Sequence, residues 1–415
     1  MRTSISPDSQ SPNTRSDIGA SILGASRSCE SAIRKSDPCA DALLDVTPLR
    51  LSQKTPLGVS LFTHASMLEE MRSGPFGSRH LIEGLLSELE LRAKTVGRRS
   101  TPWLRWQIPH DLLDSAEIME LMYSIGKRFE LGAHRANHYC VCFTPNELTG
   151  SRVALFKGLG FNTLELVYNP CNSSSGASLV SLSSAQSLQQ QLVNARGIAS
   201  DYQFSQLTIR LDHYPEGFTQ ALQQLVAENQ PLPDVINTTS CEFQQQDNFG
   251  NLYQSLKYLG YRVLGNDCFV RPGSELAKAQ ASYHLKLTPH GYNCQNVADI
   301  VGLGPGNLSA LNLLRYENSP SLTDYLSQPE GEIRATQQQQ IRLKLVLDNL
   351  LCYHQLDLKY FRSRYELDLQ PIIEQAWSAY KNGYLFVIRN HLVTLTPAGI
   401  RQLTPLCCAL IQQFD

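Results

Sequence analysis

Between about residue 58 and residue 230, short apolar segments alternate with longer segments whose apolar residues recur at helical spacing. The short segments predict buried strands and the longer ones predict helices. This alternation is typical of βαβ units on a parallel sheet, and about six units in roughly 190 residues favour a barrel or partial barrel over a small open sheet. The pattern predicts strands over 58–63, 138–143, 163–168, 204–211 and 260–266, and helices over 80–94, 112–129, 146–159, 185–199 and 215–228, with Gly160 ending the third helix.

The two ends of the chain differ from the middle in composition and in hydrophobic pattern. Residues 1–45 are rich in Ser, Pro, Asp and Arg and poor in apolar residues, so we expect them to be disordered. We assign residues 46–335 to the α/β barrel. Residues 336–415 predict a winged-helix-like domain, with helices over 337–353, 357–367 and 369–382, a hairpin over 383–394 that turns at Arg389-Asn390, and a last helix capped by Thr396.

Composition narrows the possible partners. The 415 residues are 42% hydrophobic and 18% charged, with a formal net charge of −2. The chain can therefore bury a core but lacks the basic excess that attracts nucleic acid or anionic membranes. Lys359, Arg362 and Arg364 form only a small positive face, and we expect no nucleic-acid partner. No apolar run approaches the roughly 20 residues of a membrane span, and no secretory signal pattern is present, so we expect a cytoplasmic protein.

The eleven cysteines are scattered and do not resemble a disulfide framework, so we expect reduced, mostly buried thiols. Cys140 and Cys142 lie on a predicted strand, and we expect their thiols to face opposite sides of the sheet. The spacing of Cys268, His284, His290 and Cys294 matches no zinc pattern. The sequence therefore predicts no metal site. Gly302-Leu-Gly-Pro-Gly306 predicts a tight turn rather than a phosphate-binding loop.

Five motifs in the second half of the chain occur in the order found in one known family. The first motif, G-Y-x-x-I-G-M-D-H-F-A-x-P-x-D-E-L-A, is similar to residues 260–277, and Q-G-Y-T is similar to residues 290–293. G-x-G-x-S-A resembles residues 302–310, S-L-I-C-x-x-x-L-D resembles residues 349–357, and V-T-x-x-G resembles residues 395–399. The family with these motifs is that of the oxygen-independent coproporphyrinogen III oxidases, which are radical S-adenosylmethionine (SAM) enzymes. The resemblance covers about residues 57–414. It implies a radical-SAM-like α/β fold, a partial β/α barrel with a C-terminal winged-helix-like domain.

The family's radical chemistry depends on a [4Fe–4S] cluster held by three cysteines at C-x3-C-x2-C, because the cluster needs soft, deprotonated sulfur ligands. The motif is expected after the first strand. There, His64 is retained, but no cysteine occurs between Cys39 and Cys140. We therefore expect no cluster.

The positions that the resemblance assigns to SAM are also changed. The family's tyrosine before the cysteine motif is replaced by Phe62. Its G-G-G-T-P strand end matches residues 98–102, where Ser100 replaces a glycine and Thr101 is retained. Cys142 stands in place of the family's ribose-side Glu, Asn169 in place of its Gln, and Arg210 in place of its Asp. Losing the glycines and the carboxylates together predicts that SAM does not bind. No residue is assigned a catalytic role.

The end of the family's fold that contacts the tetrapyrrole is better retained. By resemblance, the expected tetrapyrrole-binding residues are Asp267, Cys268, Arg271, His290 and Tyr292. A planar guanidinium can pair with a propionate, an aromatic ring can cover a pyrrole face, and Cys268 or His290 could offer a haem iron an axial ligand.

Three hypotheses follow. The favoured one is a relative without radical chemistry that binds haem, a porphyrin or a biosynthetic intermediate, or that acts as an accessory to a genuine coproporphyrinogen oxidase or another protein of haem metabolism. The second is a scaffold or interaction protein with no small ligand. The third, by family transfer, is retained oxidative decarboxylation of coproporphyrinogen III in porphyrin biosynthesis.

Overall fold

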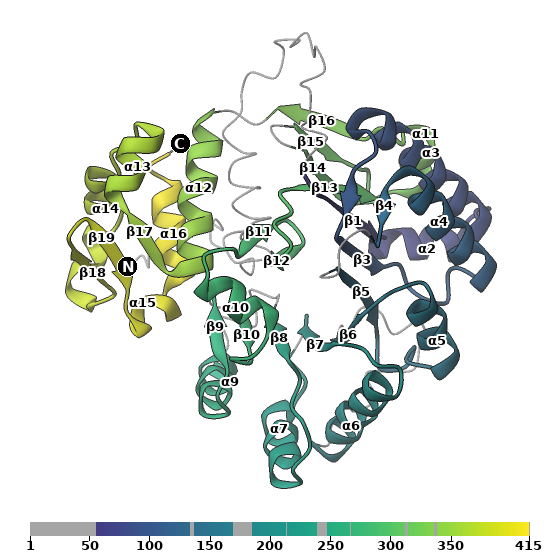
Figure 1. Cartoon of the computed structure of the whole chain (residues 1–415), viewed down its shortest axis with the longest axis horizontal. Helices are drawn as coiled ribbons and strands as arrows, with labels where there is room; N and C mark the ends of the chain where they lie inside the picture. The colour runs from purple at the N-terminus through teal and green to yellow at the C-terminus, as the bar shows by residue number, and fades with distance from the viewer. Residues whose placement is uncertain are drawn as a thin grey trace, which may run out of the picture.

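A curved sheet of twelve strands forms the centre of the molecule, with helices packed on its outer side (Figure 1). The computed structural model describes residues 55–132, 137–168, 185–212, 214–238, 247–265, 267–311, 314–335 and 338–414. The predicted disordered segment 1–45 lies outside these residues. The α/β prediction is confirmed.

The middle of the sheet is parallel and its two edges are antiparallel. The parallel strands, in spatial order, are β13 (Asp299–Leu303), β1 (Leu57–Phe62), β3 (Trp103–Gln107), β5 (His138–Phe143), β6 (Thr163–Tyr168), β7 (Gln206–Leu211) and β8 (Val235–Thr238). Antiparallel β14 (Leu308–Leu311), β15 (Leu314–Glu317) and β16 (Glu332–Ala335) extend one edge, and β10 (Cys268–Val270) and β9 (Arg262–Leu264) extend the other. Within the described strands β16 and β9 do not pair, so the barrel is partial.

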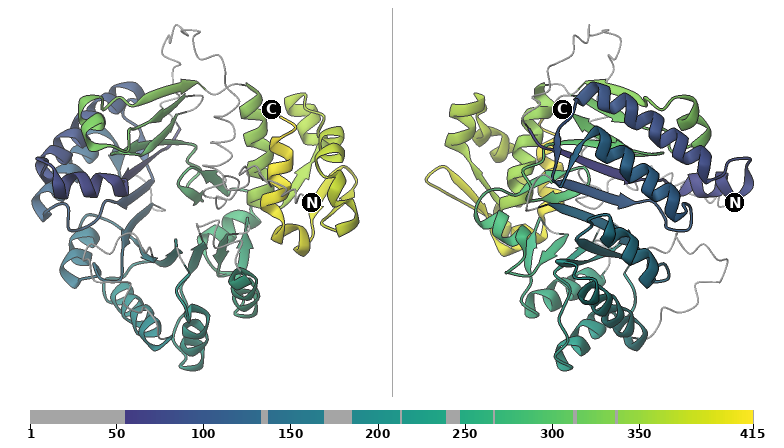
Figure 2. Two further views of the ribbon diagram at one scale, coloured as in Figure 1. Left: turned by 180° about the vertical axis from the view of Figure 1, so that it is seen from behind. Right: turned by 45° about the vertical axis from the view of Figure 1, so that its right-hand side comes forward.

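Helices connect successive strands and cover the convex face of the sheet, as the turned views show (Figure 2). They are α2 (Ala65–Ser73), α3 (Ser78–Val96), α4 (Ser115–Arg128), α5 (Gly150–Gly158), α6 (Ala185–Asp201), α7 (Phe218–Ala227), α9 (Asp247–Tyr258), α10 (Glu275–Ala281) and α11 (Leu322–Ser327). Two small ladders lie outside the main sheet: β2 (Ser100–Thr101) with β4 (Glu130–Leu131), and β11 (Lys286–Thr288) with β12 (Gly291–Asn293).

Element boundaries follow local chemistry. The predicted strands 138–143 and 163–168 match β5 and β6 residue for residue. The helix expected from residue 112 begins instead at Ser115, because the Asp114 carboxylate accepts a hydrogen bond from the Glu117 amide at 2.8 Å and caps the helix there. Gly160 has the expected positive φ, 93°.

The C-terminal unit has the expected winged-helix arrangement of helices and a three-stranded sheet. It comprises α12 (Gln338–Tyr353), β17 (Gln355–Asp357), α13 (Leu358–Tyr365), α14 (Leu369–Ala376), a 3₁₀ turn (Ser378–Gly383), β18 (Phe386–Arg389), β19 (Leu392–Leu395), α15 (Pro397–Arg401) and α16 (Leu403–Ile411). The expected turn at Arg389-Asn390 is displaced by one residue: Arg389 pairs with Leu392, and Asn390 and His391 form the turn with φ of 50° and 64°. Positive φ at both central residues is the geometry that a two-residue hairpin needs.

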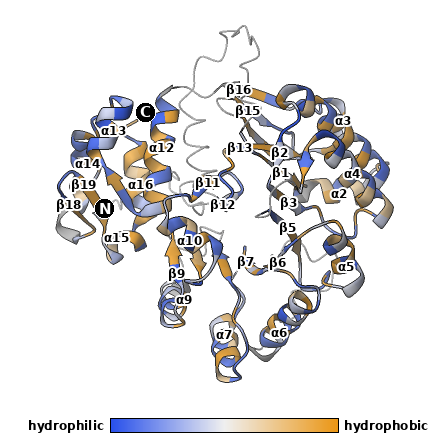
Figure 3. Ribbon diagram, viewed as in Figure 1, coloured by the Kyte–Doolittle hydropathy of each residue, from blue (hydrophilic) through white to orange (hydrophobic). Residues whose placement is uncertain are grey.

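Buried apolar residues form two large cores and two clusters of three residues each. Figure 3 shows hydrophobic and hydrophilic residues alternating along the strands and helices. The larger core lies between the parallel strands and their covering helices. The smaller core joins β9, β10 and α10 to α12 and the rest of the C-terminal unit, for instance through Leu264, Leu276 and Leu350. The C-terminal unit is thus packed directly on one end of the sheet. Within the described residues no helix is both long and apolar enough to cross a membrane.

The turn between β13 and β14 is held by a buried carboxylate. Glu88 of α3 is fully buried; it accepts hydrogen bonds from the Gly304 amide, Asn318 Nδ2 and the Tyr325 hydroxyl, each at 2.9 Å, and pairs with Arg92 at 3.3 Å. Gly304 has φ of 109°, and a Cβ there would lie 2.1 Å from the Phe62 carbonyl oxygen, so only glycine fits. The expected tight turn is confirmed.

We expect Glu88→Gln to lower the free energy of unfolding by about 3–5 kcal/mol, because it leaves the buried Arg92 without its charge partner. The matched control is Glu83→Gln on the exposed face of the same helix, where Glu83 pairs with Arg79 at 3.2 Å. The cost of that change should stay below about 0.5 kcal/mol. Urea unfolding followed by circular dichroism measures both. Equal losses in the two variants would contradict the assignment.

Candidate functional site

A small polar cavity lies inside the partial barrel, between its strands and the β11–β12 ladder. The volume is about 40 Å³, enough for one or a few water molecules. Arg105 of β3, Cys140 of β5 and Glu165 of β6 line one side, and His290 and Tyr292 line another. Inward-pointing side chains of adjacent parallel strands therefore meet segments that come much later in the sequence.

An ion-pair network occupies this interior. Glu165, with its side chain 2% exposed, accepts hydrogen bonds at Oε1 from Arg105 at 2.5 Å and from Arg210 of β7 at 3.1 Å. Arg210 also lies 3.1 Å from Asp212. Burial on its own would lower the pKa of Arg105, but the adjacent carboxylate raises it above its ordinary value. Both guanidinium groups thus stay charged, as a buried carboxylate requires.

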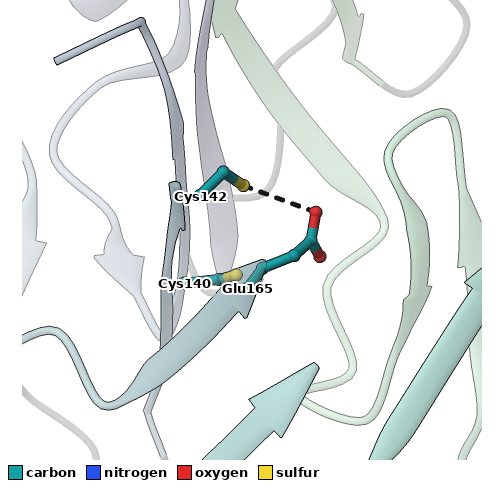
Figure 4. A group of neighbouring side chains, drawn as sticks. All are labelled: Cys140, Cys142 and Glu165. Atoms are coloured by element: carbon teal, nitrogen blue, oxygen red, sulfur yellow. Dashed lines mark hydrogen bonds between the residues drawn. The ribbon is translucent and has the colours of Figure 1, made fainter. Parts of the chain in front are cut away.

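Cys140 and Cys142 join this network (Figure 4). Cys142 Sγ lies 3.5 Å from Glu165 Oε1, and one ligand atom from each of the three residues lies within 4.8 Å of the others. The expectation that the two thiols face opposite sides of the sheet is wrong, because residues two apart on a strand share a face. The hydrogen bond between the thiols, together with burial, holds the pKa of Cys140 well above its ordinary value.

The structure brings three of the five expected tetrapyrrole-binding residues to the cavity: Cys268, His290 and Tyr292. Asp267 is buried outside it, and its carbonyl oxygen accepts a hydrogen bond from the Thr238 amide at 2.7 Å. Arg271 is exposed just beyond β10 and is not among the residues that line the cavity.

Of the two candidate haem ligands, His290 already has hydrogen-bonding partners and Cys268 is buried. His290 Nδ1 lies 3.3 Å from the Ser60 hydroxyl, and Nε2 lies 3.2 Å from the Leu308 carbonyl oxygen. Burial raises the pKa of Cys268 well above its ordinary value, which keeps its sulfur protonated. Tyr292 donates its hydroxyl hydrogen to the Leu351 carbonyl at 3.1 Å, which fixes the ring against the C-terminal unit.

The expected SAM positions fall into two groups. Phe62 ends β1, Cys142 lies near the end of β5 and Arg210 near the end of β7, so these three lie toward one end of the sheet. Ser100 and Thr101 form the two-residue strand β2 and come before the start of β3, so they lie toward the opposite end of the sheet. Asn169 lies outside the described residues.

The C-terminal end of β3 has none of the glycines that the family's G-G-G-T-P strand end implies. Trp106 and Gln107 occupy it, and Trp106 is buried. Arg99, which precedes the strand, is buried and donates to Asp299 and to the Thr55 carbonyl, both at 2.8 Å, which ties the starts of β13 and β1 together.

Sequence reasoning missed Arg105, His138 and Glu165. Their signal is a lone ionisable residue inside an otherwise apolar strand, as in Trp103–Gln107 and Thr163–Tyr168. Such a residue has to point into the barrel or find a partner across the sheet, because buried charges are rarely unpaired.

Comparisons with known proteins agree on one group of relatives. The chain is similar to the oxygen-independent coproporphyrinogen III oxidase of Pseudomonas aeruginosa, 22% identical over 64% of this chain and 63% of the relative. For that of Thermostichus vulcanus, the identity is 30% over 37% of this chain and 51% of the relative. The chain thus spans less than two thirds of the length of these relatives. No family model matches.

The fold is similar to a solved structure, that of coproporphyrinogen III oxidase from Escherichia coli, described as a radical SAM enzyme. The TM-score is 0.71 over 92% of this chain and 98% of the other, with 18% identity. The radical-SAM-like architecture expected from the motifs is therefore confirmed.

We expect His138 in the cavity to stay neutral down to acid pH. Burial, and then the charge of Arg105, lower its pKa from 6.5 to about 4. Between pH 6.5 and pH 4, the His138 imidazole binds a proton in the unfolded chain but not in the folded chain. His138 therefore makes the folded protein less stable as the pH falls from 6.5 toward 4. An NMR titration of the imidazole resonances, assigned with His138→Gln, measures the pKa. A midpoint near 6.5 would contradict the burial argument.

Proposed function

The chain belongs to the oxygen-independent coproporphyrinogen III oxidase family, and we propose that it is a member without radical SAM chemistry that binds a tetrapyrrole. The observation that carries the first part is the Arg105–Glu165–Arg210 network, which occupies the barrel interior, combined with the missing cysteine motif. In this proposal the protein serves haem metabolism by binding rather than by catalysis.

The start of the chain's barrel does not fit an iron–sulfur cluster. Only Thr63 and His64 separate β1 from α2, whose nine residues include no cysteine. Three thiolates on one loop are the ligands that such a cluster needs. On the SAM side, Cys142 and Arg210 stand where the resemblance implies carboxylates, and Arg210 is already committed to Glu165 and Asp212.

The cavity supports binding of an anionic group. Arg105 lines it, donates to Glu165 and to the His290 carbonyl, and keeps its Nε without a partner among the described residues. A propionate of a tetrapyrrole could accept from this buried donor through a charge-assisted hydrogen bond. The cavity of about 40 Å³ has room for a carboxylate but not for the macrocycle. We therefore propose that one propionate enters while the ring rests against residues such as Tyr292 and Leu276.

Haem and metal-free porphyrin are both candidate ligands in this proposal. Axial ligation of haem by His290 would require breaking its contact with Ser60 or with the Leu308 carbonyl. Recognition through propionates does not need the iron. We therefore expect the protein to bind haem and metal-free porphyrin with similar affinity. A protein so loaded could act alone or as an accessory to a genuine coproporphyrinogen oxidase or another protein of haem metabolism.

The first test addresses the chemistry. After anaerobic reconstitution with iron and sulfide, we expect far fewer than the about four iron atoms per chain that one cluster requires, no reduced-cluster EPR signal, and no heat of SAM binding in calorimetry. A stoichiometric cluster with micromolar SAM affinity would return the chain to the oxidase hypothesis.

The second test addresses the ligand. We expect saturable Soret changes with coproporphyrin and haem, weakened about tenfold or more by Arg105→Lys, which loses the planar fork, and by Tyr292→Leu, which removes the ring. Arg271→Ala is the matched control, because Arg271 is exposed and outside the cavity.

Circular dichroism checks that each variant is folded. Binding that Arg271→Ala weakens and Arg105→Lys leaves unchanged would place the ligand elsewhere. No saturable binding by the wild type would leave the scaffold hypothesis.

A further inference from the structure

We propose that Cys140, Cys142 and Glu165 form a binding site for one thiophilic divalent cation, Zn²⁺ in the first instance, with the fourth coordination position open to the cavity. The site goes beyond the proposed function and does not depend on a tetrapyrrole. It uses residues that share one face of two adjacent strands, β5 and β6 (Figure 4).

The geometry is close to what zinc requires. Zinc takes thiolate sulfur at about 2.3 Å and carboxylate oxygen at about 2.0–2.2 Å, so two ligand atoms of one tetrahedral ion lie roughly 3.5 Å apart. Cys142 Sγ lies 3.5 Å from Oε1 of the Glu165 carboxylate, whose other oxygen, Oε2, is the one left for the metal, and one ligand atom from each of the three residues lies within 4.8 Å of the others. Small rotamer adjustments of the cysteines would close the rest.

The carboxylate is oriented for this role by its neighbours. Arg105 and Arg210 both donate to Oε1 of Glu165, while Oε2 accepts no hydrogen bond from the described residues. A metal can therefore use Oε2 without displacing either guanidinium. Outer-shell donors that fix a ligating carboxylate are a regular feature of metal sites.

Charge balance also favours a divalent ion. In the metal-free network the charges of Glu165 and Asp212 offset those of Arg105 and Arg210. Binding Zn²⁺ with loss of the two thiol protons adds two positive and two negative charges, so the buried network stays neutral. A buried site that gained net charge would carry a large desolvation cost.

The cavity offers space for a fourth ligand. Cys140 lines the cavity, and so does His138, two residues earlier on the same strand face. The cavity has room for a water molecule on the metal. Three protein ligands and one open position are typical of zinc sites that exchange a small ligand.

The test uses the full chain, freed of metal with a chelator and titrated anaerobically with Co²⁺ and then Zn²⁺. We expect one Co²⁺ per chain, with near-ultraviolet sulfur-to-cobalt charge-transfer bands of two thiolates that Zn²⁺ abolishes. Cys140→Ser and Cys142→Ser should each weaken binding by more than the about 10–100-fold that loss of an outer-shell partner costs. Cys268→Ser is the matched control, since Cys268 is buried and lines the same cavity outside the cluster.

X-ray absorption spectroscopy of the zinc-loaded wild type does not depend on whether the variants fold. We expect it to show two sulfur neighbours of zinc at about 2.3 Å. No stoichiometric binding, no sulfur neighbour, or binding that survives both serine substitutions would overturn the proposal. An equal loss in Cys268→Ser would overturn it as well.

Discussion

The buried carboxylate of Glu165 is the constraint around which the barrel interior is organised. A charge removed from water needs partners of opposite sign and donors for its lone pairs. Arg105 and Arg210 supply both from the strands on either side of the β5–β6 pair, and Asp212 compensates the second guanidinium. The side chains that face the cavity are therefore set by one electrostatic requirement rather than by apolar packing alone.

This arrangement changes what the fold can do. The motifs resemble those of a radical SAM family, and the proposed function follows from the bulk and charge that the strand ends carry here. Phe62 leads almost directly into α2, Trp106 occupies the end of β3, and Arg210 stands where the relatives are expected to have a carboxylate. The architecture is similar to that of the solved structure, and the interior holds the network of Arg105, Glu165 and Arg210.

The sequence predicted the fold well because buried parallel strands and their covering helices have strong, short-range signatures. β5 and β6 matched to the residue, since both are mainly apolar segments flanked by polar residues. The site was predicted less well. Arg105 and Glu165 come together only through the register of β3, β5 and β6, and no local pattern specifies that meeting. The error on Cys140 and Cys142 had a different origin. Residues two apart on a strand point to the same face, so the sequence alone was enough to predict that these two thiols lie on one side of the sheet.

The pairing of β1 has a consequence for how the chain is made. One neighbour of β1, β3, follows it closely in the sequence, but the other, β13, begins only at Asp299. During translation, β1 therefore emerges with one edge unpaired and keeps it so until most of the chain has been synthesised. Unpaired edges and distant contacts slow folding and invite aggregation, so this edge of the sheet can close only late in synthesis.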